Sequence, residues 1–87
     1  MLFEFDEAKS ASNLIKHGID FIEAQSLWSD GDLLIVPAKD LDELRFVAIG
    51  MIGFKHWSAV FTLRGESIRI ISVRRSRDKE VEAYEGI

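Results

Sequence analysis

The sequence has 87 residues, of which 47% are hydrophobic and 30% charged, a balance that indicates one folded domain and excludes a disordered chain. It has no cysteine and no signal-peptide pattern, which excludes disulfides and thiolate metal sites and favours a reducing cytoplasm, and its apolar runs fall far short of the roughly 20 residues that span a membrane. The formal net charge of −4 is unusual for a nucleic-acid binder, because phosphate neutralisation supplies most of the non-specific affinity.

The first third of the chain predicts a short strand followed by two helices. Residues 2–5 alternate apolar and polar side chains, as a strand does. Asp6 can cap a helix that runs to about His17, and Gly18 is placed to end it. A second helix is expected over 19–28, so the two form an N-terminal helical hairpin.

The pattern then changes to strands rich in β-branched and aromatic residues, at 33–36, 45–52, 57–64 and 67–74. A polar loop at 38–43 and two hairpin-length breaks with glycine separate them. Ser76 can cap a last helix over 77–85. The class is therefore α+β: a helical hairpin, an antiparallel sheet of about four to five strands and a C-terminal helix, in a single domain over 1–87. One sheet face would be left partly open to a partner.

Positive charge is concentrated between residues 64 and 79. The cations there are Arg64, Arg69, Arg74, Arg75, Arg77 and Lys79. Strict alternation along the last strand places Arg69 and Arg74 on opposite faces, with Arg74 beside Ile70. Each arginine alone is better explained as a solvated or salt-bridged charge at a strand end. Together with Lys16 and His17 they could instead surround one phosphate-sized pocket.

Such a cluster suits cleavage of RNA by its own ribose 2′-hydroxyl, without a metal. The reaction needs a base for the hydroxyl, an acid for the leaving 5′-oxygen and cations for the pentavalent phosphate. His17 could transfer a proton, although its place at a helix C-terminus is better explained by the helix dipole. Since metal-ligand spacing and a glycine-rich phosphate loop are both missing, neither a metal nor a cofactor is expected.

Five stretches together resemble the BrnT family of bacterial toxins. They are F-E-F-D-E-A-K at 3–9, N-L-I-K-H-G-I-D-F at 13–21, L-R-F-V-A-I-G at 44–50, F-T-L-R-G-E-S-I-R-I-I-S-V-R-R-S at 61–76, and the pair Glu80 and Tyr84. The resemblance implies a RelE-like ribonuclease fold and growth arrest by cleavage of an RNA substrate, within a type II toxin–antitoxin system. It also implies a BrnA-like antitoxin partner, through which alone the toxin would meet operator DNA, and the free toxin could form a homodimer.

The same resemblance supplies candidate site residues, to which the cation cluster adds Arg77. The candidate catalytic residues are Lys16, His17, Arg64, Arg74 and Arg75; the candidate substrate-binding residues are Arg45, Arg69, Arg77 and Tyr84. Which group is the acid and which the base stays open.

The last helix departs from the family, because many members have an arginine-rich helix there and this one is nearly neutral to acidic. An alternative is therefore a non-catalytic protein-interaction module on the same scaffold, favoured if ion pairs to Glu66, Asp78 or Glu80 close the arginine cluster. A third possibility is another small enzyme or small-molecule binder, favoured by a deep apolar pocket away from the arginines.

Overall fold

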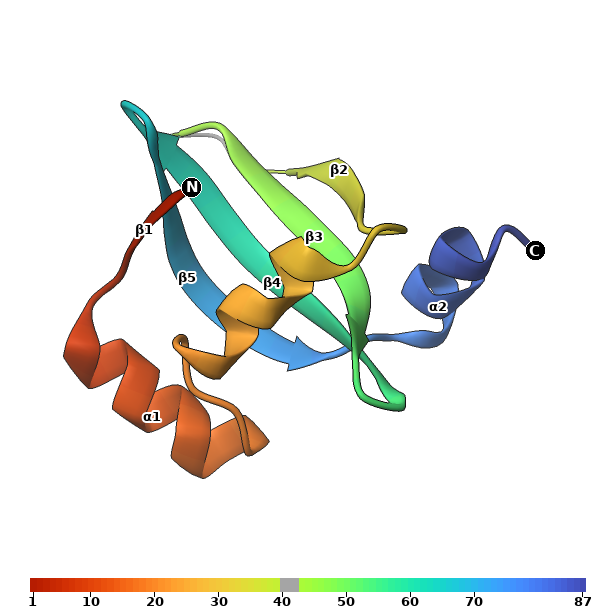
Figure 1. The fold of residues 1–87 in the computed structure, drawn as a ribbon, viewed down its shortest axis with the longest axis horizontal. Helices are drawn as coiled ribbons and strands as arrows, with labels where there is room; N and C mark the ends of the chain where they lie inside the picture. The colour runs from red at the N-terminus through yellow and green to blue at the C-terminus, as the bar shows by residue number, and fades with distance from the viewer. Residues whose placement is uncertain (40–42) are drawn as a thin grey trace.

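The computed structural model describes residues 1–39 and 43–87 of the chain (Figure 1). Its elements in chain order are β1 (Leu2–Glu4), α1 (Glu7–His17), the 3₁₀ helix η1 (Glu23–Ser29), β2 (Leu34–Ala38), β3 (Arg45–Ile52), β4 (Lys55–Arg64), β5 (Ser67–Arg75) and α2 (Asp78–Glu85). The expected α+β class is confirmed, while residues 40–42 of the expected polar loop lie outside the described part.

The sheet has five strands in the order β1-β5-β4-β3-β2. Strands β2 to β5 form the expected antiparallel meander, but β1 pairs parallel to β5, with Leu2 opposite Ser67. The expectation of a purely antiparallel sheet was therefore wrong. The first strand joins the edge of β5, whose backbone groups would otherwise be unpaired, and no sequence-local turn could reveal that partner.

The N-terminal helical hairpin was only partly right. Helix α1 begins and ends as expected: the carboxylate of Asp6 accepts a 3.1 Å hydrogen bond from the backbone N–H of Lys9, and Gly18 ends the helix with φ +79°. The second helix is the 3₁₀ helix η1 rather than an α-helix. It buries Ala24 and Leu27, three residues apart, which matches the three-residue repeat of a 3₁₀ helix.

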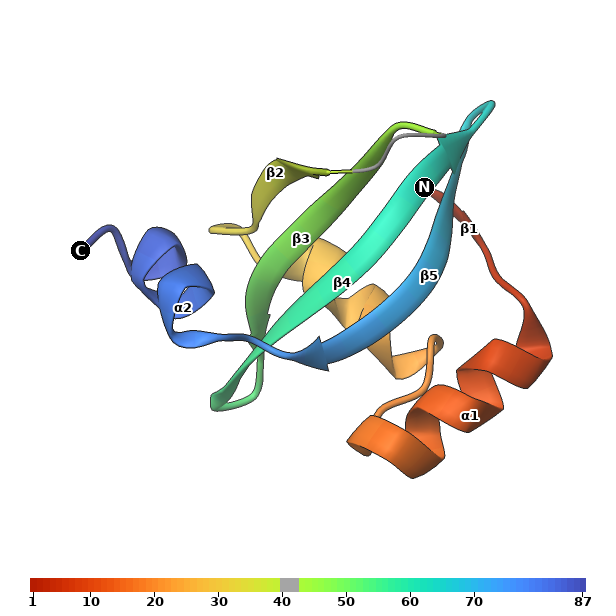
Figure 2. The same ribbon diagram turned by 180° about the vertical axis from the view of Figure 1, so that it is seen from behind.

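The core lies between η1, the segment before it and one face of the sheet. Its fully or nearly fully buried hydrophobic residues are Ile19, Phe21, Ala24, Leu27, Ala48, Trp57, Ala59, Phe61, Ile68, Ile70 and Val73. Figure 2 shows the opposite face of the sheet, where α2 lies at one end and no other helix of the described residues crosses the strands. We call this side the open face.

Buried Asn13 attaches α1 to the sheet. Its side-chain amide donates to the backbone oxygens of Ile19 and Val73, at 2.8 and 2.9 Å, and its Oδ1 accepts from the N–H of Val73 at 3.2 Å. The end of α1 is thereby held next to the end of β5.

A β-bulge decides which side chains of β5 reach the open face. Phe61 pairs with Ile70 but Val60 pairs with Ser72, so Ile71 is an extra residue in β5. Strict alternation along β5 was therefore the wrong assumption. The bulge places Ile70 and Val73 together in the core and puts Arg69 and Arg74 on the same, open face.

Candidate functional site

Four of the candidate arginines share the open face of the sheet. Strand alternation and the bulge place Arg45, Arg64, Arg69 and Arg74 there. Two of them have carboxylate partners near the surface: Arg45 Nε lies 3.1 Å from Glu43 Oε1, and Arg69 Nη1 lies 4.0 Å from Glu4 Oε2. The open face is therefore a row of arginines in a chain whose net charge is negative.

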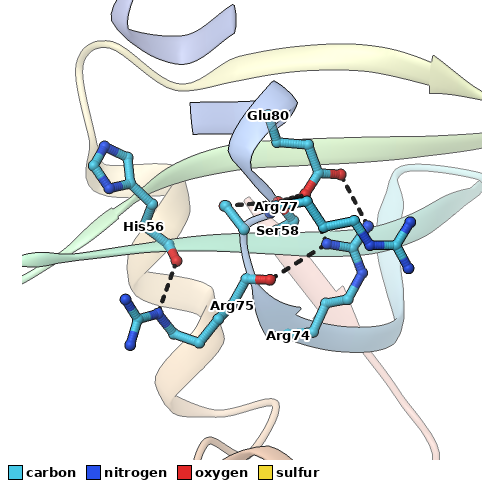
Figure 3. Close-up of polar contacts among 7 residues, drawn as sticks. His56, Ser58, Arg74, Arg75, Arg77 and Glu80 are labelled. Carbon is cyan, nitrogen blue, oxygen red and sulfur yellow. Dashed lines mark hydrogen bonds and ion pairs between the residues drawn. The ribbon is translucent and has the colours of Figure 1, made fainter. Parts of the chain in front are cut away.

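Arg74 is held much more firmly than the others, by Glu80 of α2 (Figure 3). Its Nη1 and Nη2 donate to the two carboxylate oxygens of Glu80 at 2.7 and 2.9 Å, a bidentate pair. Ser58, opposite Arg74 on β4, donates its hydroxyl to Glu80 at 3.0 Å, and the backbone N–H of Arg77 donates to the same carboxylate at 2.8 Å.

These contacts shift the acidity of both partners in the pair. The hydrogen bonds from Arg74 lower the pKa of Glu80 to about 2, helped by the Arg77 N–H and the Ser58 hydroxyl against the opposing effect of burial. The same bonds raise the pKa of Arg74 above its ordinary value. The pair therefore stays ionised across the physiological range.

Arg75 leaves β5 in a different direction from Arg74 (Figure 3). Its Nε donates to the backbone oxygen of His56 at 3.3 Å, and its guanidinium lies 5.5 Å from the ring centroid of Trp57, a cation–π distance. Arg77 caps the start of α2 with an exposed side chain. Two of the candidate arginines therefore lie next to Arg74, and the guanidinium group of neither binds Glu80, which Arg77 contacts only through its backbone N–H.

Tyr84 attaches the C-terminal end of α2 to Asp30, the residue that follows η1. Its hydroxyl donates to Asp30 Oδ2 at 2.7 Å, and the N–H of Met51 donates to the same oxygen at 2.9 Å. The bond to Asp30 raises the pKa of Tyr84 to about 12. Burial alone would raise the pKa of Asp30, but hydrogen bonds from the N–H groups of Asp32 and Met51 and from Tyr84 lower it overall.

His56 also contacts α2. Its Nε2 lies 2.7 Å from Glu85 Oε2, and its ring packs edge-on against that of Tyr84. Glu80, Tyr84 and Glu85 thus attach α2, which has no buried residue of its own, to the sheet and to η1.

Lys16 and His17 lie exposed in the last turn of α1. Because Asn13 binds the backbone of Val73, this turn lies beside the end of β5 that carries Arg74 and Arg75 (Figure 1). These four candidate catalytic residues therefore belong to one end of the molecule.

The single pocket around all the candidates was the wrong expectation. Arg64 pairs with Ser67 at the opposite end of the hairpin from Ser58 and Arg74. Six positions on β4 separate Ser58 from Arg64, or about 20 Å of extended strand. The turn at Gly65 joins the end of β4 to the start of β5, so Arg64, at the end of β4, and Arg74, near the end of β5, lie at opposite ends of the sheet.

The sequence predicted only part of what fixes Arg74. Glu80 was expected only as one of the acidic residues that could close the arginine cluster by an ion pair, which it does with Arg74, and no sequence signal pointed to Ser58. Its hydroxyl also lies 2.8 Å from that of Ser76, the residue after β5. Pairing β4 with β5 by counting from the turn would have put Ser58 opposite Val73, so only the bulge reveals it.

Two apolar grooves lie away from the Arg74 end. One, of about 280 Å³, lies between α1 and the segment before η1 and is lined by Phe5, Glu7, Ser10, Ala11, Leu14, Asp20 and Ile22. The other, of about 290 Å³, opens on the core side near β1 and is lined by Met1, Trp28, Ile35, Phe46, Phe61, Leu63 and Ile68. Neither is lined by a candidate site residue.

Residues 1–39 and 43–87 contain no group of three or more histidine, aspartate or glutamate side chains that could hold a metal ion. Within the same ranges, the helices are too short and too polar to cross a bilayer.

Comparison with known proteins identifies the family. A comparison with curated proteins returned no match. Residues 5–80 match the family model described as "Ribonuclease toxin, BrnT, of type II toxin-antitoxin system". The matched segment contains every candidate site residue except Tyr84, and it covers most of the chain. The chain therefore belongs to the BrnT family of ribonuclease toxins of type II toxin–antitoxin systems.

Proposed function

We propose that this chain is a single toxin domain, spanning residues 1–87, that cleaves RNA in the cytoplasm without a metal or another cofactor. The observation that carries the proposal is the firmly held Arg74 at the end of an arginine-bearing open face, flanked by Arg75 and Arg77. Family membership supplies the reaction class. The face supplies a surface on which successive phosphates can lie.

In the proposed reaction, the ribose 2′-oxygen bonds to the adjacent phosphorus and the bond from phosphorus to the 5′-oxygen breaks. The 2′-hydroxyl proton passes to a base, an acid protonates the 5′-oxygen, and the products are a 2′,3′-cyclic phosphate and a 5′-hydroxyl. Arg74 stabilises the charge on the pentavalent phosphate, and Arg75, which leaves β5 in a different direction, adds positive charge at the same end of the sheet. Proton transfer falls to the turn that carries Lys16 and His17, because imidazole suits this task near neutral pH.

The remaining candidates bind the RNA on either side of the cut. Arg45, Arg64 and Arg69 lie further along the open face, where each can contact a phosphate, and Arg77 lies beside Arg74. Arg64 is thus assigned to substrate binding because of its distance from Arg74. For Tyr84 we propose a supporting role beside the RNA, since its hydroxyl already binds Asp30.

The partner of the proposed toxin is a BrnA-like antitoxin that binds this domain and blocks the RNA site. Operator DNA is contacted only by the antitoxin within the complex. The free toxin can associate into a homodimer through the apolar surface that it exposes, which includes Leu63 and Ile35 at 56% and 47% exposure.

A second candidate function, a non-catalytic interaction module, is favoured by one specific observation. The ion pair between Arg74 and Glu80 neutralises the best placed cation. An enzyme and such a module differ in whether the chain itself breaks RNA, so one experiment separates them.

The test compares the parent with Arg74→Ala, both expressed under an inducible promoter and both purified for cleavage of an oligoribonucleotide. We expect growth arrest and cleavage by the parent, and at unchanged protein level neither from Arg74→Ala. Arg74→Lys keeps the charge but not the bidentate fork, and we expect it to recover little activity. Lys55→Ala removes one exposed positive charge at the first residue of β4 and serves as the matched control.

The outcomes are distinct. Equal cleavage by the parent and Arg74→Ala would remove Arg74 from the site. A folded parent that neither arrests growth nor cleaves RNA would favour the interaction module instead.

A further inference from the structure

The carboxylate of Glu80 is confined by four donors from three parts of the chain. Two come from the guanidinium of Arg74, one from the hydroxyl of Ser58 and one from the backbone N–H of Arg77. Its side chain is 19% exposed. A carboxylate with so many partners has one preferred orientation, and it transmits that orientation to whatever it binds.

Arg74 still has donors to offer after this pairing. A guanidinium carries five N–H groups. Glu80 takes one from Nη1 and one from Nη2, on the end edge of the group, and the oxygen of Arg75 accepts a long bond from Nη1 at 3.4 Å. Within residues 1–39 and 43–87, no hydrogen bond engages Nε or the second hydrogen of Nη2. Those two donors form a side edge, which can bind two phosphate oxygens in parallel.

We propose that Glu80 is a positioning residue, which fixes Arg74 so that its Nε and Nη2 edge faces the phosphate that is cleaved. The inference rests on the proposed function, and it assigns a role to a residue outside the candidate site. It also explains how an acidic last helix serves an RNA-cleaving site. The helix contributes the carboxylate that orients a cation on the sheet.

Glu80 could act on Arg74 in two ways: it could orient the guanidinium (positioning), or it could neutralise its charge and so prevent it from binding phosphate (blocking). The two roles make opposite predictions for the loss of Glu80. If Glu80 orients Arg74, its removal frees the guanidinium to rotate and the reaction slows. If Glu80 only neutralises Arg74, its removal releases a cation and the reaction accelerates. The four-donor arrangement favours positioning, because blocking would need only the pair.

The first test measures kcat and KM for one oligoribonucleotide with the parent, Glu80→Gln and Glu80→Asp. The control is Glu85→Gln, which removes another ion-paired carboxylate of α2 that does not touch Arg74. We expect kcat of Glu80→Gln to fall by about tenfold to a hundredfold with KM changed much less, since misorientation acts on the transition state. Glu80→Asp keeps the charge and should recover part of kcat, and Glu85→Gln should resemble the parent.

A second test does not depend on RNA cleavage. The ¹⁵N resonance of Arg74 Nε is followed while inorganic phosphate is added to the parent and to Glu80→Gln. We expect phosphate to shift this resonance in the parent and to require about tenfold more in the variant, because the side edge is no longer held in place.

The outcomes separate the two proposals. Loss of cleavage in Arg74→Ala combined with unchanged or faster cleavage by Glu80→Gln overturns the positioning role alone. An inactive parent whose Arg74 Nε still responds to phosphate in a Glu80-dependent way overturns the proposed reaction and leaves the positioning intact. A response that is identical in parent and Glu80→Gln overturns the positioning whatever the activity. Thermal unfolding of each variant identifies any that fails to fold, in which case Glu80→Asp carries the test.

Discussion

The two ends of the open face hold their arginines in different ways. At one end, Arg74 is 24% exposed and bound through two short hydrogen bonds to Glu80. At the other, Arg69 faces Glu4 across 4.0 Å, and Arg64 is exposed without an ion pair to any described residue. The bidentate pair fixes the direction of the Arg74 guanidinium, whereas the contacts of Arg64 and Arg69 fix no single direction.

The difference indicates that one end of the open face serves RNA binding and the other serves the chemical step. A mobile surface cation attracts phosphate and gains affinity, but it gives little preference for one geometry of the transition state. A cation fixed by a second side chain can act selectively on the transition state. We therefore expect chemistry at the Arg74 end and RNA binding at the Arg64 end.

The largest expected effect compares these ends directly by alanine substitution. Arg74→Ala should reduce kcat/KM for an oligoribonucleotide by about a hundredfold to a thousandfold, the usual loss of a group that stabilises the transition state. Arg64→Ala should reduce it by about tenfold or less, through KM, and the loss should shrink at high salt because surface charges are screened. Steady-state kinetics at two salt concentrations measure both.

An equal loss of kcat in the two variants would contradict this difference between the two ends. So would a loss in Arg64→Ala that does not depend on salt.

Local sequence signals predicted the elements well but not the faces of the last strand. The cap at Asp6, the stop at Gly18 and the glycine turns each act within a few residues, so they locate α1 and the meander. The bulge at Ile71 is a property of two paired strands and reverses the face of every residue beyond it. For this reason the grouping of Arg69 with Arg74 could not be predicted from β5 alone.

The geometry of two tertiary contacts, those of Glu80 and Asn13, was equally hard to predict. Glu80 lies six positions after Arg74 and reaches it only because α2 folds back over the end of the sheet. Asn13 is 7% exposed and binds the backbone of Val73, sixty residues away. Both contacts depend on tertiary packing, which helix periodicity does not encode.

The second prediction concerns Asn13, whose hydrogen bonds hold α1 next to the end of β5 that carries Arg74. Asn13→Ala leaves the oxygens of Ile19 and Val73 and the N–H of Val73 without their partner in a buried place. We expect the free energy of unfolding to fall by about 3 kcal/mol, since each unsatisfied buried group costs on the order of 1–3 kcal/mol and water can reach some of them. Urea unfolding followed by tryptophan fluorescence measures the loss.

The matched control is Asn13→Asp, which keeps the shape and one acceptor but loses the amide donors. It should be at least as destabilising as alanine at neutral pH. A stable Asn13→Ala variant would show that α1 is held by its apolar contacts instead.

The third prediction concerns Gly50, which packs against Asp30, the residue that binds Tyr84 of α2. A Cβ at Gly50 would lie 3.0 Å from Asp30 Oδ2 and 3.1 Å from a methyl group of Leu27, whereas a Cβ at Gly31 would meet nothing within 4 Å. Gly50→Ala should cost about 1–2 kcal/mol of unfolding free energy through overpacking, and Gly31→Ala about zero. The two variants have the same composition, so thermal unfolding compares the positions alone. Equal melting temperatures would mean that Asp30 and its bond to Tyr84 can shift without cost.

The smallest expected effect is the pH dependence of the pair that holds Arg74. Folding lowers the pKa of Glu80 from its ordinary 4.5 to about 2. The ionised form is therefore the one that stabilises the folded state, and its contribution is fully present above pH 4.5 and lost as the pH falls toward 2. Because the pair lies near the surface, where solvent screens it, we expect the contribution to be about 1 kcal/mol. Glu80→Gln lacks this titration, so the difference in unfolding free energy between parent and variant should be constant above pH 5 and shrink steadily below it. A difference that stays constant down to pH 3 would mean that the carboxylate of Glu80 is not held by Arg74 in solution, and the contrast between the two ends of the open face would then disappear.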